Sequence, residues 1–280
     1  MTRRGLVLGG GGVAGIAWET GLAAGLAEAG VDLLAADVIV GTSAGSTVAA
    51  QITSGLSLEE LFRRQTDPAL QARELTAVLD AEAVGALFGV AYAAAAGDPV
   101  ALRRRIGELA LEAPTVPEAE RLEVIAARLP SHTWPDRVLK IVAVDARSGE
   151  ERVFDKDSGV NLVDAVAASC AVPGTWPPVT IGDRRYIDGG VRSGENADVA
   201  TGCERAIVVQ VMEIPGGTDL EDQLAGLRAA DSRVSVVRPD EASLDAIGTN
   251  VLDPAVREPA AKAGREQGLR VAAELAGLWN

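Results

Sequence analysis

The chain has 280 residues, of which 48% are hydrophobic and 24% charged, and its formal net charge is −14. This length and composition suffice for a full globular core, in one large α/β domain or two small ones. The acidic balance argues against nucleic acid as a partner and against purely electrostatic docking on anionic lipid. The two cysteines, Cys170 and Cys203, show neither a pairing pattern nor metal-ligand spacing, which is typical of reduced thiols in a cytosolic protein.

Two segments have some features of targeting or membrane signals. Thr2–Leu8 faintly resembles a twin-arginine export signal, but glycines interrupt the apolar stretch after it, and no small-residue cleavage site precedes Glu19. The longest uncharged run, Ala83–Gly97, is shorter than the roughly 20 residues needed to span a bilayer. We therefore expect a cytoplasmic protein that could contact membranes peripherally.

Near the N-terminus the sequence predicts two strand–helix units. Arg4–Leu8 is a short apolar strand, and Val13–Ala29 carries apolar residues at helical spacing and stops before Gly30. Asp37–Val40 is a second buried strand, and a helix is expected over Ser46–Ser54. Strands and helices that alternate through tight glycine turns predict a doubly wound, mostly parallel sheet flanked by helices, which is an α/β fold.

The middle of the chain, Leu58–Leu129, is predicted to be helical almost throughout, so we expect a helical insertion over about residues 57–130. Strands and helices then alternate again, with a hairpin that turns at Gly182-Asp183. The elements expected after the insertion are strands Leu139–Asp145 and Glu151–Phe154, helix Leu162–Cys170, hairpin Val179–Asp188, strand Ala206–Val211, helix Leu220–Ala230, strand Val234–Val237 and a final helix from Pro254 to about Leu278. No linker-like stretch divides the chain, so a single domain over 1–280 is expected.

Four consecutive glycines follow the first strand in GLVLGGGGVAGIAWETG, and two functions are open to them. Gly10, Gly12 and Gly15 match the G-x-G-x-x-G pattern that binds a dinucleotide pyrophosphate. That site also needs an acidic residue at the end of the second strand, whereas Asp32 and Asp37 precede this strand. No Gly-Lys-Ser/Thr follows, which argues against a P-loop. The alternative is a loop whose amides stabilise negative charge on a reacting carbonyl.

The second strand runs into a G-x-S-x-G motif, Gly41–Gly45, with Ser43 at its centre. Between a strand and a helix, this pattern makes a sharp, strained turn that exposes the serine hydroxyl at the helix N-terminus. The helix dipole there favours developing negative charge. The alternative is that Ser43 is only an N-cap residue.

A serine nucleophile needs a base, and the composition restricts the choice. The single histidine, His132, lies before the later strands, so it does not take the last place that histidine occupies in α/β-hydrolase triads. A Ser-x-x-Lys arrangement is absent, because Ser46 is three residues after Ser43. Asp188, which ends a hairpin strand and precedes Gly189-Gly190, is the leading carboxylate candidate; alternatively it only closes a turn. Partial burial would raise its pKa toward that of an effective base.

Three motifs thus follow one another: GGGGVAG at residues 9–15, GTSAG at 41–45 and DGG at 188–190. This ordered set resembles the patatin-like phospholipase family. The stretch VAASCAVPGTWPPV, Val166–Val179, is also similar to the family segment that precedes the Asp-Gly-Gly. The resemblance covers roughly residues 5–200.

The resemblance implies a Ser-Asp dyad that hydrolyses lipid acyl esters, with no metal or other cofactor. Ser43 would be the nucleophile, and Asp188 the proton acceptor, first from Ser43 and then from the deacylating water. The backbone amides of the glycine loop would form the oxyanion hole. The residues carried over to the oxyanion hole are Gly10, Gly11 and Gly12, and the remaining motif glycines are Gly15, Gly41, Gly45, Gly189 and Gly190.

The chain departs from the family pattern at two places. The family's glycine loop usually carries Arg or Lys just before its last glycine, where this chain has Ala14. Since a basic residue there could contact a phosphate group, a neutral ester or thioester becomes an alternative to a phospholipid substrate. Ser193–Ala197 (SGENA) replaces the usual Asn…Pro segment after the Asp-Gly-Gly, so the resemblance does not predict the structure of this loop.

The sequence therefore predicts a serine lipid acyl hydrolase, a phospholipase or esterase, whose partner is a lipid or other acyl-ester substrate. Two alternatives stay open: an acyltransferase with the same dyad, and a nucleotide-binding or catalytically silent regulatory protein. Ala83–Gly97 is either a buried helix or an apolar flap over the site that makes transient membrane contact. Trp18 and Trp176 are expected to pack in the core, with Trp18 an alternative acyl-pocket residue. Headgroup, chain length and oligomeric state are not predicted.

Overall fold

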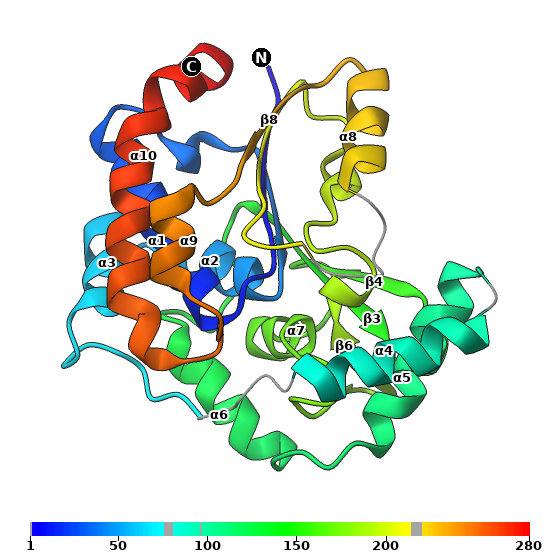
Figure 1. Cartoon of the computed structure of the whole chain (residues 1–280). Helices are drawn as coiled ribbons and strands as arrows, with labels where there is room; N and C mark the ends of the chain where they lie inside the picture. Colours follow the sequence, from blue (N-terminus) through cyan, green and yellow to red (C-terminus); the bar gives the residue numbers. More distant parts are fainter. Residues whose placement is uncertain (1, 76–80, 96, 214–219) are drawn as a thin grey trace.

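The computed structural model describes residues 2–75, 81–95, 97–213 and 220–280, and within them one eight-stranded sheet forms the centre of the molecule (Figure 1). The strand order is β5-β6-β3-β2-β1-β7-β8, with β4 also paired to β3. The strands are β1 (Arg4–Leu8), β2 (Val38–Thr42), β3 (Val138–Asp145), β4 (Glu151–Phe154), β5 (Val179–Ile181), β6 (Arg184–Asp188), β7 (Arg205–Val209) and β8 (Arg233–Val237). Strands β3, β2, β1, β7 and β8 are parallel neighbours, while β4, β5 and β6 pair antiparallel. The predicted α/β class with a mostly parallel sheet is confirmed.

Helices cover both faces of this sheet. The α-helices are α1 (Gly12–Glu28), α2 (Ala44–Ile52), α3 (Leu58–Thr66), α4 (Ala81–Ala95), α5 (Pro99–Glu112), α6 (Glu118–Arg128), α7 (Leu162–Ser169), α8 (Leu220–Ala229), α9 (Glu241–Ile247) and α10 (Arg257–Trp279). Alternate strand residues, such as Ile141 and Val142, belong to different core clusters because successive side chains of a strand point to opposite faces. One cluster joins the sheet to α1, α2, α7 and α10; on the other face, α8 packs over the middle of the sheet and α5 packs near β3 and β6.

The predicted strands are all present, and the differences lie at element ends and in short elements. Strand β2 continues through Gly41 and Thr42, and α2 begins at Ala44 instead of Ser46, so only Ser43 separates the two. Pro254–Val256 forms a 3-10 turn ahead of α10, which begins at Arg257. Helix α9 was not predicted, because its seven residues are too few for an apolar period to show.

Between α2 and β3 the described residues form helices α3 to α6, in agreement with the predicted helical insertion. In α4, Ala91 is buried against α5, while Val90 and Tyr92 are about half exposed. The side chains of Leu87 and Phe88, on which the flap prediction depended, lie outside the described residues. None of the described helices is both long and apolar enough to cross a membrane.

Helix α1 is buried between the sheet and α10, and glycines allow the two helix backbones to touch (Figure 1). A Cβ atom on Gly21 would lie 2.0 Å from the carbonyl oxygen of Ala261, and one on Gly264 would lie 2.2 Å from that of Trp18. Since both obstacles are backbone atoms, a side chain at either position would force the helices apart.

The contact predicts opposite effects for the same substitution at two positions of α10. Gly264→Ala should lower the free energy of unfolding by about 1–3 kcal/mol, because the helices must separate. Gly277→Ala should raise it by up to about 1 kcal/mol, since nothing lies within 4 Å of the added methyl group and alanine favours helix. Urea unfolding followed by circular dichroism measures both, and equal effects would contradict the tight contact.

Candidate active site

Strand register brings Ser43 and Asp188 to the same level of the sheet. Thr42 of β2 is opposite Val142 of β3, and the next β3 residue, Ala143, is opposite Asp188 of β6. Strand β6 runs antiparallel to β3 and pairs only with residues 143–145 at the carboxyl end of β3, so Asp188 lies one register position from the end of β2. Ser43 and Asp188 therefore lie on either side of β3, and both line one cavity.

Ser43 has a backbone conformation that is rare for a residue with a side chain. Its φ is 51° and its ψ is −117°, in the region that usually requires glycine, so the peptide is strained. Hydrogen bonds hold it on both sides. Its N–H donates to Ser169 Oγ at 2.9 Å, and its carbonyl oxygen accepts from Ser46 Oγ at 2.6 Å and from Cys170 Sγ at 3.1 Å. The predicted sharp turn is present, and Ser43 at its centre is partly buried and lines the cavity.

The elbow and the glycine loop are joined by close backbone packing. The N–H of Gly45 donates to the carbonyl oxygen of Gly9 at 2.9 Å, and a Cβ atom on Gly45 would lie 2.1 Å from the carbonyl oxygen of Leu8. The glycine at position 45 therefore allows the start of α2 to lie directly on the end of β1.

Asp188 is a buried carboxylate with one oxygen engaged and one free. It is 4% exposed, and its Oδ1 accepts from the N–H of Gly190 at 2.8 Å, so it does cap the turn that follows β6. Oδ2 accepts no hydrogen bond within the described part of the chain. Burial raises the pKa of Asp188 to about 7, while the Gly190 N–H, the facing Ser43 hydroxyl and the charge of Arg121 act in the opposite direction. A carboxylate with this pKa accepts protons near neutral pH, unlike a solvated aspartate.

The three glycine amides predicted for the oxyanion hole are not equivalent. The N–H of Gly10 donates to the carbonyl oxygen of Gly194 at 2.9 Å, so it is already used within the fold. Gly11 and Gly12 begin α1, and within the described residues their N–H groups have no acceptor; both residues line the cavity. Gly12 has a φ of 62°, which glycine adopts without strain. The available donors of this loop are therefore Gly11 and Gly12, and the assignment of Gly10 is corrected.

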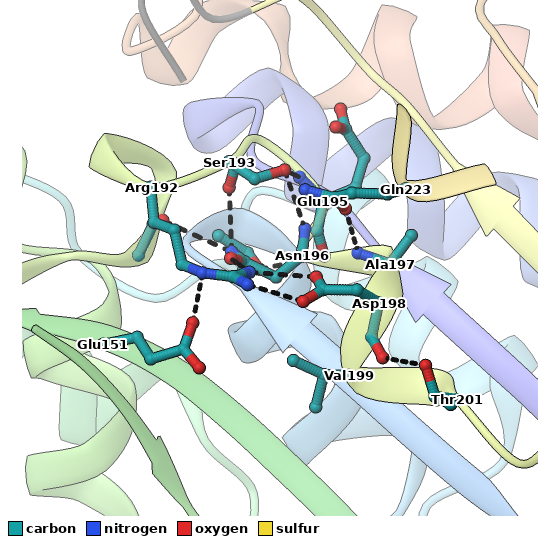
Figure 2. Close-up of polar contacts among 12 residues, drawn as sticks. Glu151, Arg192, Ser193, Glu195, Asn196, Ala197, Asp198, Val199, Thr201 and Gln223 are labelled. Carbon is teal, nitrogen blue, oxygen red and sulfur yellow. Dashed lines mark hydrogen bonds and ion pairs between the residues drawn. The ribbon is translucent and has the colours of Figure 1, made fainter. Parts of the chain in front are cut away.

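The Ser193–Ala197 loop, which the family pattern left undefined, contacts the three motif segments. Figure 2 shows the polar contacts around Ser193 and Asn196. Asn196 is fully buried, and its Nδ2 donates to Thr42 Oγ1 of the elbow strand at 3.0 Å and lies 3.3 Å from the carbonyl oxygen of Gly189. Gly194 accepts from Gly10, as described above. A single loop thus contacts the glycine loop, the elbow strand and the turn after Asp188.

Arg192 holds this loop from the outside (Figure 2). Its guanidinium donates to Asn196 Oδ1 at 2.6 Å and to Asp198 at 2.9 Å, and it also pairs with Glu151 of β4. Because Oδ1 of Asn196 is occupied in this way, the amide is oriented with Nδ2 toward Thr42.

The cavity at the dyad has a volume of about 310 Å³, which lies in the range of small-molecule sites. Its wall is mostly apolar and comes from segments far apart in the sequence. The residues that line it include Val13, Ile16, Val172, Pro173, Trp176, Val191, Met212, Val251 and Leu252, beside the glycine loop, Ser43, Asp188, Arg121, Arg128 and Cys170. An apolar wall around a polar reacting centre suits an acyl chain.

Other sequence candidates lie away from this cavity. His132 is exposed in the loop before β3, and its Nε2 is 3.0 Å from the carbonyl oxygen of Ala126. Trp18 is fully buried and donates to Gln267 in the core, so it is not a pocket residue. At the end of β2, where a dinucleotide site needs an acid, the chain has Ser43.

Several cavity residues were not found from the sequence. Val251 and Leu252 lie beyond the last recognised motif, yet the carbonyl oxygen of Val251 accepts from the N–H of Ala14 at 3.0 Å, which closes the wall beside the glycine loop. Arg121 was missed because no motif marks it, and Cys170, although it lies in the family-like stretch Val166–Val179, was interpreted only as a reduced thiol. Their place depends on how the insertion and α7 pack.

Comparison with known proteins agrees with this architecture. A family model described as "Patatin-like phospholipase" matches residues 6–201, so the chain belongs to the patatin-like phospholipase family. Membership of this family makes it a lipid hydrolase by class, as the motif order predicted. None of the curated protein sequences matches the chain.

Solved structures are similar to this chain at low sequence identity, and the likeness of fold rests on the first of them. VipD from Legionella pneumophila is similar with a TM-score of 0.52 and 14% identity, over 98% of this chain and 67% of VipD. The type III effector protein ExoU gives a TM-score of 0.45 and 18% identity over 98% of this chain and 53% of its own. ExoU in its complex with SpcU, from the type III secretion system of Pseudomonas aeruginosa, gives 0.39 and 16%, over 96% and 52%. The chain thus spans about half the length of the ExoU chains.

Buried carboxyl groups predict an unusual pH dependence of stability. Burial raises the pKa values of Asp188 and Glu195 to about 7 and that of Glu19 well above its usual range. A carboxyl group whose pKa is raised by folding stabilises the folded state. This contribution is complete below the pKa of the unfolded chain, which is near 4, and it is lost as the pH rises to about 7. The melting temperature should therefore fall between pH 5 and pH 8, by an amount worth on the order of a few kcal/mol.

Glu195→Gln should reduce this dependence, because it removes one of the groups that must ionise while buried. The exposed Glu123→Gln is the matched control and should leave the slope unchanged. Differential scanning calorimetry across the pH range measures both variants. A wild-type melting temperature that does not fall over this range would contradict the burial of ionisable carboxyls.

Proposed function

We propose that this protein hydrolyses acyl esters of lipids through a covalent intermediate on Ser43, with Asp188 as the general base. The observation that carries the proposal is the strained Ser43 facing a buried carboxylate of raised pKa across one apolar cavity. Family membership supports the lipid substrate class.

In the first half-reaction, Ser43 Oγ attacks the ester carbonyl carbon while its proton passes to the free Oδ2 of Asp188. The negative charge that develops on the carbonyl oxygen is stabilised by the N–H groups of Gly11 and Gly12, aided by the N-terminus of α2. The carbon–oxygen bond to the alcohol then breaks, and the alcohol takes the proton from Asp188. The acyl group remains on Ser43.

In the second half-reaction, Asp188 accepts a proton from water as the water attacks the acyl-serine carbonyl. The bond to Ser43 Oγ breaks, the proton returns to Ser43 and the fatty acid leaves. Asp188 is ionised again at the end, so the cycle is closed.

Ser43→Ala should abolish labelling by a fluorophosphonate probe and lower ester turnover by at least about 1000-fold, because no nucleophile remains. Ser131→Ala, in the loop before β3 and outside the cavity, is the control and should label as the wild type does. Labelling is measured on gels, and turnover is followed by mass spectrometry of fatty acid released from a lipid panel. Acyl products on added alcohols without free fatty acid would indicate acyl transfer instead. Labelling that persists in Ser43→Ala would remove this serine as nucleophile.

The pH profile of kcat/KM tests the base. Since Asp188 accepts a proton only when ionised, activity should fall about tenfold per pH unit below its pKa of about 7 and stay level above it. Asp188→Asn should lower turnover by roughly 100-fold to 10,000-fold.

Two controls separate Asp188 from other titrating groups. His132→Gln should keep the wild-type profile; it is the decisive control, because it removes the one histidine of the sequence. Asp183→Asn, at the exposed turn of the same hairpin, should keep both rate and profile. A profile that changes with His132 and not with Asp188 would contradict the assignment.

A further inference from the structure

Arg121 is a buried cation in the wall of the cavity that contains Ser43 and Asp188. It belongs to α6 of the helical insertion and is only 4% exposed. Its guanidinium lies over the ring of Trp176, with Cζ 3.8 Å from the ring centroid. Stacking on an indole fixes the plane of the guanidinium and leaves its N–H edges for acceptors.

Those edges have no acceptor within the described residues. The buried Nε and Nη1 atoms of Arg121 lack hydrogen-bond partners, and no described carboxylate forms an ion pair with it. Burial and the nearby charge of Arg128 lower the pKa of Arg121 to about 9, so it is still charged at neutral pH. A buried charge with unpaired donors is costly unless a ligand supplies the acceptors.

Arg128 provides an internal comparison on the same helix. It also lines the cavity, but its Nε and Nη2 donate to the two carboxylate oxygens of Glu74 at 2.9 and 2.6 Å. One arginine of the pair is therefore neutralised by the fold, and the other is left unpaired. The arrangement provides one unpaired positive charge beside the reacting centre.

We propose that Arg121 binds the phosphodiester of a glycerophospholipid whose acyl ester lies at Ser43. This rests on the proposed hydrolase function and specifies its substrate class. A guanidinium suits two oxygens of a phosphate better than any neutral acceptor. In a glycerophospholipid the phosphate is only a few bonds from the acyl ester, so one molecule can fill the charged and apolar parts of the cavity. The buried Ala14 of the glycine loop carries no charge, and Arg121 supplies the cation from the insertion instead.

Binding is tested without turnover in the Ser43→Ala background. Calorimetric titration with dihexanoylphosphatidylcholine, below its micelle concentration, should show at least tenfold weaker affinity when Arg121→Gln is added. Dihexanoylglycerol, which lacks the phosphate, should bind the two proteins within threefold. Hexanoate and inorganic phosphate are titrated in the same way as two further ligands. An Arg121 effect on hexanoate alone would assign the charge to the carboxylate product and overturn the proposal, as would an effect on inorganic phosphate without one on the lipid.

Turnover gives a second readout, measured at pH 8 so that Asp188 is mostly ionised in each variant. Arg121→Gln should lower kcat/KM for the phosphatidylcholine by about 10-fold to 100-fold and for the diacylglycerol by less than threefold. Arg121→Lys should recover part of the loss, since it restores the charge without the planar pair of donors. The exposed Arg105→Gln, on α5, removes the same charge outside the cavity and should match the wild type.

The outcomes separate the two proposals. Equal losses on both lipids, or none on either, would overturn the role of Arg121 in phosphate binding while leaving the hydrolase intact. Wild-type protein that turns over neither lipid would contradict the hydrolase function, and the binding arm would still decide whether Arg121 recognises the phosphate. Circular dichroism and melting temperatures establish that each variant is folded.

Discussion

The start of α2 packs against the end of β1 so closely that residue 45 has no room for a Cβ atom. This contact fixes the height of Ser43 above the sheet and, through the Gly45–Gly9 hydrogen bond, the path of the glycine loop beside it. The strained φ of Ser43 persists because donors and acceptors from α2 and α7 hold its peptide on both sides. Ser43 and the free amides of the glycine loop are thus positioned by one contact between backbones, which needs no adjustment by long side chains.

Buried charge is the second organising feature. Desolvation gives Asp188 a pKa near neutrality, and Arg121 provides the opposite charge in the same cavity without forming an ion pair with it. A direct pair would hold Asp188 ionised but lower its basicity. Leaving the two groups separate keeps the carboxylate basic and the guanidinium available. The cost is a site that is electrostatically unsatisfied when empty, which is a common property of pre-organised sites.

The sequence predicted the fold and the motif residues because they depend on local pattern. Apolar strands, glycine turns and the order of the three motifs are visible without knowing what packs against them, and the family match confirms the resemblance. The loss of Gly10 as a free donor could not be predicted, since its acceptor is Gly194, far away in the sequence. The burial of Arg121 could not be predicted for the same reason. It is one of several charged residues on α6, and only the packing of the insertion buries it. Catalytic roles for Ser43 and Asp188 stay predictions.

Val251 and Leu252 lie outside the region that the family model matches, yet they form part of the cavity wall. The cavity wall therefore combines segments inside and outside the matched region. Its reacting end is built from segments whose geometry permits little variation, such as the elbow and the glycine loop. The wall beside the glycine loop comes from the connection between α9 and α10, where the carbonyl oxygen of Val251 is bonded to Ala14 but side-chain size can vary without disturbing the sheet. Related proteins could in this way diverge in the acyl groups they accept while keeping the same chemistry.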